Sequence, residues 1–166
     1  MQENALKIFF PGKLVFGTGT LMQLADDIVQ LKPRRVFIGT IRALEGSIAS
    51  FLDMVRKNNI EILSDTSIVQ EPGFRAFGIL MEKVLPFDPD IVIGIGGGSV
   101  LDIAKLVAAQ LDNDQQLKDY FGIGLLKGRK KKLICVPATS GTGSEVSPNA
   151  ILVDDDNQKK GIISPY

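Results

Sequence analysis

The sequence contains no histidine, no tryptophan and only one cysteine, Cys135, among its 166 residues. The missing histidines exclude imidazole metal ligands and every Ser-His or Cys-His nucleophile pair from these residues. A single cysteine excludes an internal disulfide and a thiolate zinc cluster, and it is typical of a reducing compartment. Any catalysis by these residues must therefore use carboxylates, hydroxyls, lysines or a bound cofactor.

Excess charge and long apolar runs are also missing. Nineteen basic residues balance nineteen acidic ones, which argues against a protein that binds nucleic acid or anionic membranes. No apolar run approaches the length of a membrane span, and the first residues lack the basic flank and apolar stretch of a signal peptide. We therefore expect a soluble, cytoplasmic protein with no nucleic-acid or membrane partner.

Short apolar runs alternate with segments of helical periodicity along most of the chain. This alternation predicts an α/β fold with a doubly wound, mostly parallel, Rossmann-like sheet and helices on both of its faces. With no repeat and no linker, residues 1–166 are expected to form one domain. Strands are expected at 36–38, 60–63, 91–93, 133–136, 151–153 and 162–163, helices at 21–31, 44–56, 72–84 and 99–111, and an N-terminal β-hairpin from 8–10 and 14–16.

Two charge runs have competing interpretations. Residues 127–132 hold five basic side chains, which favour a solvated loop before a strand, with a phosphate or nucleic-acid patch as the alternative. Asp154, Asp155 and Asp156 favour a hairpin turn over a metal site, because three adjacent carboxylates in a turn cannot all face one ion.

A glycine loop joins an expected strand to an expected helix at Gly96, Gly97, Gly98 and Ser99. Glycines let backbone N–H groups approach a phosphate, and the helix N-terminus adds partial positive charge. Ser99 fits an N-cap, and Asp102 stands where it would close a capping box. The loop indicates a phosphate site, and a tight strand-to-helix turn is the alternative.

A second loop of small and hydroxyl residues follows the strand at 133–136. It contains Thr139, Ser140 and Thr142, whose hydroxyls suit ribose, amide and phosphate oxygens. In a doubly wound sheet both loops would emerge at the same edge, which favours a shared dinucleotide cleft. A flexible surface loop is the alternative.

Together the two motifs, GGGSVLDIAK at 96–105 and PATSGTGSE at 137–145, resemble those of the iron-containing (group III) alcohol dehydrogenase family. The resemblance implies an N-terminal α/β domain that binds NAD or NADP. It also implies a helical C-terminal domain, in which an Asp and three His hold Fe²⁺ or Zn²⁺ for an NAD(P)-dependent oxidoreductase acting on a small alcohol or aldehyde.

The resemblance also implies roles for individual residues. Residues 96–99 would hold the pyrophosphate, and Glu71 would lie beside the cofactor. Lys160 would reach a ribose hydroxyl, although a solvated hairpin lysine is its alternative interpretation. The ribose–nicotinamide end would be lined by Asp102, Thr139, Thr142 and Ser147.

The sequence departs from the family in two respects. It has no histidine and ends at Tyr166, before the family's metal ligands, so we expect an N-terminal part that is inactive alone. A stand-alone, non-catalytic nucleotide-binding module is the alternative. The residues after the strand at 36–38 are Thr40, Ile41 and Arg42, where many members carry an Asp for the ribose 2′-hydroxyl. An arginine can pair with a 2′-phosphate, which favours NADP over NAD.

Exposed apolar surface is expected where the family's second domain would dock. The candidates are Ile123, Leu125, Leu126 and residues 162–166. Such a face could also pair two chains, so a homodimer is a further expectation.

Overall fold

The computed structural model describes residues 11–68 and 72–166. Its helices are α1 (Thr20–Leu31), α2 (Glu45–Lys57), α3 (Phe74–Phe87) and α4 (Gly98–Gln110), with two 3₁₀ turns, η1 (Arg42–Leu44) and η2 (Leu117–Tyr120). Its strands are β1 (Arg35–Gly39), β2 (Glu61–Asp65), β3 (Ile91–Gly96), β4 (Gly122–Ile123), β5 (Lys132–Pro137), β6 (Asn149–Val153) and β7 (Lys159–Ile163).

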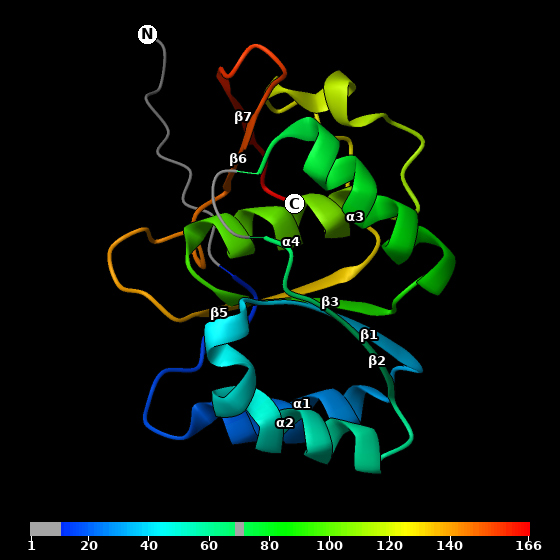
Figure 1. Cartoon of the computed structure of the whole chain (residues 1–166), viewed down its shortest axis with the longest axis vertical. Helices are drawn as coiled ribbons and strands as arrows, with labels where there is room; N and C mark the ends of the chain where they lie inside the picture. Colours follow the sequence, from blue (N-terminus) through cyan, green and yellow to red (C-terminus); the bar gives the residue numbers. More distant parts are fainter. Residues whose placement is uncertain (1–10, 69–71) are drawn as a thin grey trace, which may run out of the picture.

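A four-stranded parallel sheet lies at the centre, in the order β2-β1-β3-β5. Helices α1 and α2 cover one face, and α3 and α4 cover the other (Figure 1), which confirms the doubly wound α/β prediction. From β1 the chain proceeds outward to β2 and then returns to β3 on the other side. The carboxyl ends of β1 and β3 therefore flank the switch point at which such sheets bind ligands.

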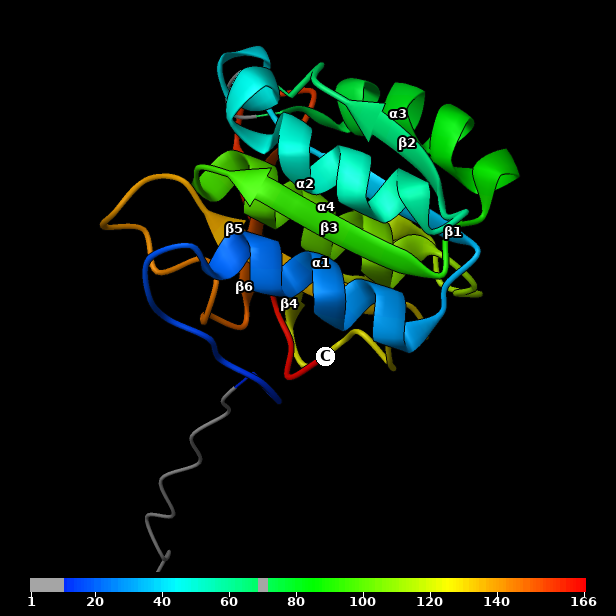
Figure 2. The same ribbon diagram turned by 90° about the horizontal axis from the view of Figure 1, so that it is seen from below.

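The central strands are buried on both faces because their side chains alternate between two cores. Val36 and Ile38 of β1 pack with Ile93 of β3 against α1 and α2, whose helices lie side by side in Figure 2. Phe37 and Val92 point to the opposite core, which α3 and α4 complete. This double burial explains why the strands read as continuous apolar runs.

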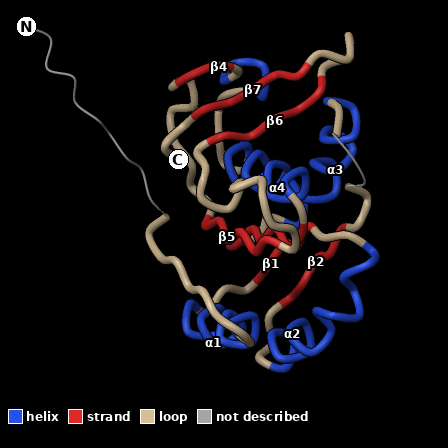
Figure 3. The backbone as a smooth tube through the Cα atoms, turned by 90° about the vertical axis from the view of Figure 1, so that its left-hand side faces the viewer, coloured by secondary structure: helices blue, strands red, loops and turns tan. Residues whose placement is uncertain are grey.

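A second, three-stranded sheet has the order β4-β7-β6, with β6 and β7 antiparallel and β4 parallel to β7. Figure 3 shows α4 between the two sheets, and buried residues such as Val107 and Leu152 join one core there. Strand β4 and turn η2 were not predicted from the sequence, since a two-residue strand that contains a glycine has no periodicity to detect.

Three sequence expectations are corrected here. In the N-terminal hairpin, residues 14–16 form no strand and Phe16 is fully exposed, whereas residues 8–10 lie outside the described part. Pro72 precedes α3, which Gly73 caps. Of the expected docking residues, Ile123 and Leu125 are exposed, but Leu126 and Ile162 are buried in the core.

None of the helices in residues 11–68 and 72–166 is both long enough and apolar enough to span a lipid bilayer.

Candidate functional site

The first glycine loop brings α4 directly onto β3. A Cβ atom on Gly94 would lie 2.8 Å from Cβ of Ala104, and one on Gly96 would lie 2.8 Å from Cβ of Val100. Only glycine allows this close approach, which aims the N-terminus of α4 at the switch point. The N–H groups of a first helical turn have no carbonyl partner within the helix and carry partial positive charge.

The start of α4 differs from the sequence expectation. The N-cap is Gly97, without a side-chain hydrogen bond, and Ser99 lies inside the first turn. Asp102 closes no capping box. It accepts hydrogen bonds from Ser144 and from the backbone N–H of Ile151 instead. The physical reason is that the backbone of Gly97 is extended and α4 begins directly after it. The N-cap therefore lies two residues before Ser99, the residue expected from the sequence.

The second glycine loop lies against the first, as expected. The N–H of Ala138 donates to the carbonyl of Gly96 at 2.9 Å. A Cβ on Gly97 would meet Oγ1 of Thr139 at 3.4 Å, and one on Gly98 would meet Cγ2 of Thr142 at 3.1 Å. Thr139 and Thr142 therefore face the glycine backbone, whereas Ser140 is simply exposed at the loop surface.

A cavity of about 270 Å³, here named the loop cavity, opens between the α4 N-terminus, the second loop and β6. Five predicted residues line it together: Gly98, Ser99, Asp102, Thr142 and Ser147. Three further polar lining residues were not predicted as site residues: Ser144, Asn149 and Lys159.

Lys160 does not line the loop cavity. Its Nζ lies 3.1 Å from Oδ2 of Asp154 and 3.3 Å from Oε1 of Gln158, within the β6–β7 hairpin. In the strand register Lys160 pairs with Leu152, which faces the core, and Lys159 pairs with Val153, which lines the loop cavity. Residues that pair across antiparallel strands point to the same face of the sheet. The alternation of faces along β7 therefore places Lys159, and not Lys160, at the loop cavity.

A polar network forms the floor of the loop cavity. The hydroxyl of Ser144 donates to Oδ1 of Asp102 at 2.5 Å. Nζ of Lys105 donates to Oγ of Ser144 at 2.8 Å and to the carbonyl of Asn149 at 2.6 Å, and it lies 3.4 Å from Oδ1 of Asp102. The nearby thiol of Cys135 has its pKa raised to about 11, chiefly by burial and only partly offset by the charge of Lys105.

Thr40 and Arg42 follow β1 on the other side of the switch point. Thr40 is buried, and its hydroxyl has no hydrogen-bond partner in the part of the chain that the structure describes. Ile41 packs against the core, and Arg42 opens η1 with an exposed side chain. Glu71, the remaining predicted site residue, lies outside the described residues.

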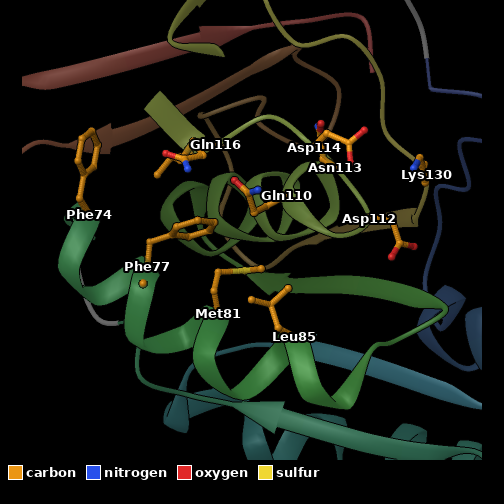
Figure 4. A pocket seen from close by; sticks show the side chains of 12 residues that line it. Phe74, Phe77, Met81, Leu85, Gln110, Asp112, Asn113, Asp114, Gln116 and Lys130 are labelled. Atoms are coloured by element: carbon orange, nitrogen blue, oxygen red, sulfur yellow. The ribbon is translucent and has the colours of Figure 1, made fainter. Parts of the chain in front are cut away.

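The larger cavity of the molecule lies elsewhere. It measures about 750 Å³ between α3 and the segment after α4. Figure 4 shows an apolar side formed by residues such as Phe77 and Met81 facing a polar rim that includes Asp112 and Asp114. None of the predicted site residues lines it. Its lining residues form no glycine loop at a helix N-terminus, so the smaller loop cavity is the better candidate for a phosphate ligand.

The basic run at 127–132 leads into β5, and its Lys127, Lys130 and Lys132 are exposed, as expected, but Lys131 faces inward. Nζ of Lys131 lies 2.7 Å from Asp88 and 3.0 Å from Asp112, and only 12% of its side chain is exposed. Burial lowers the pKa of Lys131, but the hydrogen bonds to both carboxylates outweigh it and raise the pKa. Lys131 therefore anchors the start of β5, and the exposed lysines around it favour a solvated loop over a phosphate patch.

The site suits a phosphate ester of a polyhydroxyl compound. It combines a glycine cradle, a helix N-terminus and a ring of hydroxyls, each of which fits a dinucleotide. A metal ion does not fit comparably, because no group of three or more potential ligand side chains comes together in the described ranges. Asp154 instead accepts backbone N–H bonds from Asp156 and Gln158 in its turn.

Comparisons with known proteins agree with this geometry. The sulfoacetaldehyde reductase of Bilophila wadsworthia is 32% identical over 157 residues, covering 93% of this chain and 41% of that relative. The iron-containing alcohol dehydrogenase structure from Thermococcus thioreducens has a TM-score of 0.86 at 26% identity, covering 96% of this chain and 44% of that one. The NADH-dependent butanol dehydrogenase A structure from Thermotoga maritima has a TM-score of 0.84 at 26% identity, covering 96% and 41%.

The chain thus spans about two fifths of the length of these relatives. The family model for iron-containing alcohol dehydrogenases matches residues 11–166, which is nearly the whole sequence. The two glycine loops lie together at one edge of the sheet, and the family model matches the chain that carries them. The chain belongs to the iron-containing alcohol dehydrogenase family.

Proposed function

We propose that these residues form the dinucleotide-binding domain of an NAD(P)-dependent oxidoreductase. The observation that carries the proposal is the close packing of both glycine loops around the N-terminus of α4, at the switch point of a parallel sheet. This arrangement offers backbone N–H groups and helix polarity to a pyrophosphate at glycine positions, which carry no side chain of their own.

The predicted residues of the two glycine loops that meet at the loop cavity have defined places in this proposal. The backbone of residues 96–99 binds the pyrophosphate, and Thr139 and Thr142 border it from the second loop. Asp102 and Ser147 line the loop cavity, where ribose hydroxyls would find acceptors and donors. Lys159 lines the same cavity, whereas Lys160 lies within the β6–β7 hairpin away from it, so we assign the ribose hydroxyl to Lys159.

Arg42 supports a preference for NADP. It is exposed at the start of η1, directly after the strand that borders the switch point. A guanidinium there can bind a ribose 2′-phosphate through paired hydrogen bonds, whereas a carboxylate would repel it.

The activity of the whole protein is proposed from the relatives. Their names describe alcohol dehydrogenases and an aldehyde reductase, so we assign an alcohol or aldehyde as substrate. The family implies a divalent metal, Fe²⁺ or Zn²⁺, that polarises the substrate oxygen. Within the described residues no ligand set fits it, so the residues here bind and orient the dinucleotide only.

The binding proposal is tested by titrating the chain with NADH and NADPH and following nicotinamide fluorescence. Ser99→Glu places a carboxylate in the first turn of α4, which favours the helix but repels a pyrophosphate. We expect the Kd for both dinucleotides to rise about tenfold or more, since the added carboxylate would repel the negatively charged pyrophosphate at close range. Ser47→Glu, the same change in the first turn of α2, is the matched control and should leave the Kd unchanged.

Two results would contradict the proposal. The first is that the unaltered chain binds neither NADH nor NADPH. The second is that Ser99→Glu binds both as tightly as the Ser47→Glu control.

A further inference from the structure

We infer that Lys105 is a positioning residue for the dinucleotide, and that it acts by neutralising and fixing Asp102 from behind the loop cavity. This inference rests on the proposed function, because it concerns the same site. Lys105 itself is not among the residues that line the cavity. Its ammonium group acts on the ligand only through the side chains that it holds.

The contacts of Lys105 join α4 to the second loop and to the start of β6, which follow 39 and 44 positions later in the sequence. Its Nζ donates to Ser144 of the second loop at 2.8 Å and to the carbonyl of Asn149 in β6 at 2.6 Å, and it lies 3.4 Å from Asp102 on its own helix. The side chains of Lys105 and Asp102 are only 13% and 16% exposed. Such an inward-facing lysine needs all of its partners to offset lost hydration.

The charges of Asp102 and Lys105 determine the direction of each hydrogen bond in this network. An ionised carboxylate can only accept, so the single proton of the Ser144 hydroxyl is donated to Asp102. Oγ of Ser144 must then accept its other bond from Lys105, which an ammonium group supplies. The other carboxylate oxygen accepts from the N–H of Ile151 at 3.2 Å. Asp102 is therefore held in one orientation by three neighbours.

Charge is the second part of the argument. Asp102 lies on α4, one turn beyond the helix N-terminus to which we assign the pyrophosphate, and it lines the loop cavity. An unpaired carboxylate in this half-buried place would repel the phosphates strongly. Lys105 cancels that charge from the side of Oδ1, and the second lone pair of Oδ2, which accepts from Ile151, can accept from a ligand hydroxyl.

The test is a double-mutant cycle with Lys105→Gln and Asp102→Asn, measured as the Kd for NADH by fluorescence titration of the full chain. Glutamine keeps a donor near Ser144 but removes the charge, so the network retains its packing. We expect Lys105→Gln alone to raise the Kd about tenfold, because one buried charge loses its partner. In the Asp102→Asn background the same change should raise it less than about threefold. Lys118→Gln, on exposed η2, is the control.

The outcomes separate this inference from the proposed function. If the unaltered chain does not bind NADH, the proposed function fails. If it binds but Lys105→Gln binds equally well, the positioning role is wrong. If Lys105→Gln weakens binding equally in both backgrounds, Lys105 is merely structural and the charge argument is wrong. Thermal unfolding without ligand verifies that each variant is folded.

Discussion

Nζ of Lys83 on α3 lies 2.9 Å from Oδ2 of Asp65, the buried carboxylate that ends β2. The N–H and hydroxyl of Ser67 bind the other oxygen of Asp65. Burial raises the pKa of Asp65, but the hydrogen bonds from Ser67 and Lys83 outweigh it, so its pKa lies below the ordinary 3.8. This pair joins the end of the parallel sheet to the helix that follows it.

Acid should therefore destabilise the protein partly through Asp65. A carboxyl group whose pKa is lower in the folded state contributes stability above its ordinary pKa and loses it as the pH falls through the folded value. We expect the free energy of unfolding to decrease from about pH 5 downward, and to decrease less in Asp65→Asn. Urea denaturation at several pH values measures the free energy of unfolding. Asp26→Asn, at an exposed position of α1, is the control. Parallel curves for Asp65→Asn and the unaltered protein would contradict it.

Adding one methyl group at Gly96 should destabilise the fold. The new Cβ would lie 2.8 Å from Cβ of Val100, an atom fixed by the helix backbone. Gly96→Ala is expected to lower the free energy of unfolding by about 1–3 kcal/mol because the helix must move off the strand. In Gly46→Ala on α2 the new Cβ meets nothing within 4 Å, and this control should gain about 0.5–1 kcal/mol. Equal stability of both variants in urea would refute the close packing.

Replacing Arg42 should change the choice of dinucleotide. Arg42→Asp puts a negative charge where we assign the 2′-phosphate, so the Kd for NADPH should rise about tenfold while that for NADH stays level or falls. Fluorescence titration with both dinucleotides measures the ratio, and Lys118→Asp controls for the change in net charge. A clear NADH preference of the unaltered chain would remove the basis for this assignment.

The only thiol should react slowly while the protein is folded. Burial raises the pKa of Cys135 from the ordinary 9.0 to about 11, and the thiolate is the reactive form. At a pH below both values this difference lowers the thiolate fraction about a hundredfold. The alkylation rate with iodoacetamide, compared between native and urea-unfolded protein at one pH, should differ by at least that factor. Similar rates would mean that the thiol is neither buried nor shifted.

Most of the central fold follows from local sequence signals. Strands such as 36–38 and 91–93 are buried on both faces, and their continuous apolar runs are therefore distinctive. The helix at 99–111 was placed to within one residue because eight of its 13 residues are apolar and buried. Strand β4 could not be predicted, because its two residues depend on β7 for pairing.

The candidate site was predictable in its backbone and less so in its side chains. The glycine loops and hydroxyl residues are visible as motifs, and they do come together at one sheet edge. The contact between Lys105 and Ser144 joins residues 39 positions apart, which no local pattern reveals. The choice between Lys159 and Lys160 depends on the strand register with β6, since one residue changes the face.

The placement of α4 between two sheets has a consequence for how the chain folds during synthesis. Strands β1 to β3 and α4 all precede the β6–β7 hairpin in the chain, so they can assemble before that hairpin is made. The outer face of α4 must wait for β6 and β7, and β4 must wait for its distant partner β7. Until then an apolar helix surface stays uncovered, a state that invites association with other nascent chains. Completion of the β6–β7 hairpin is therefore the step that ends this exposure.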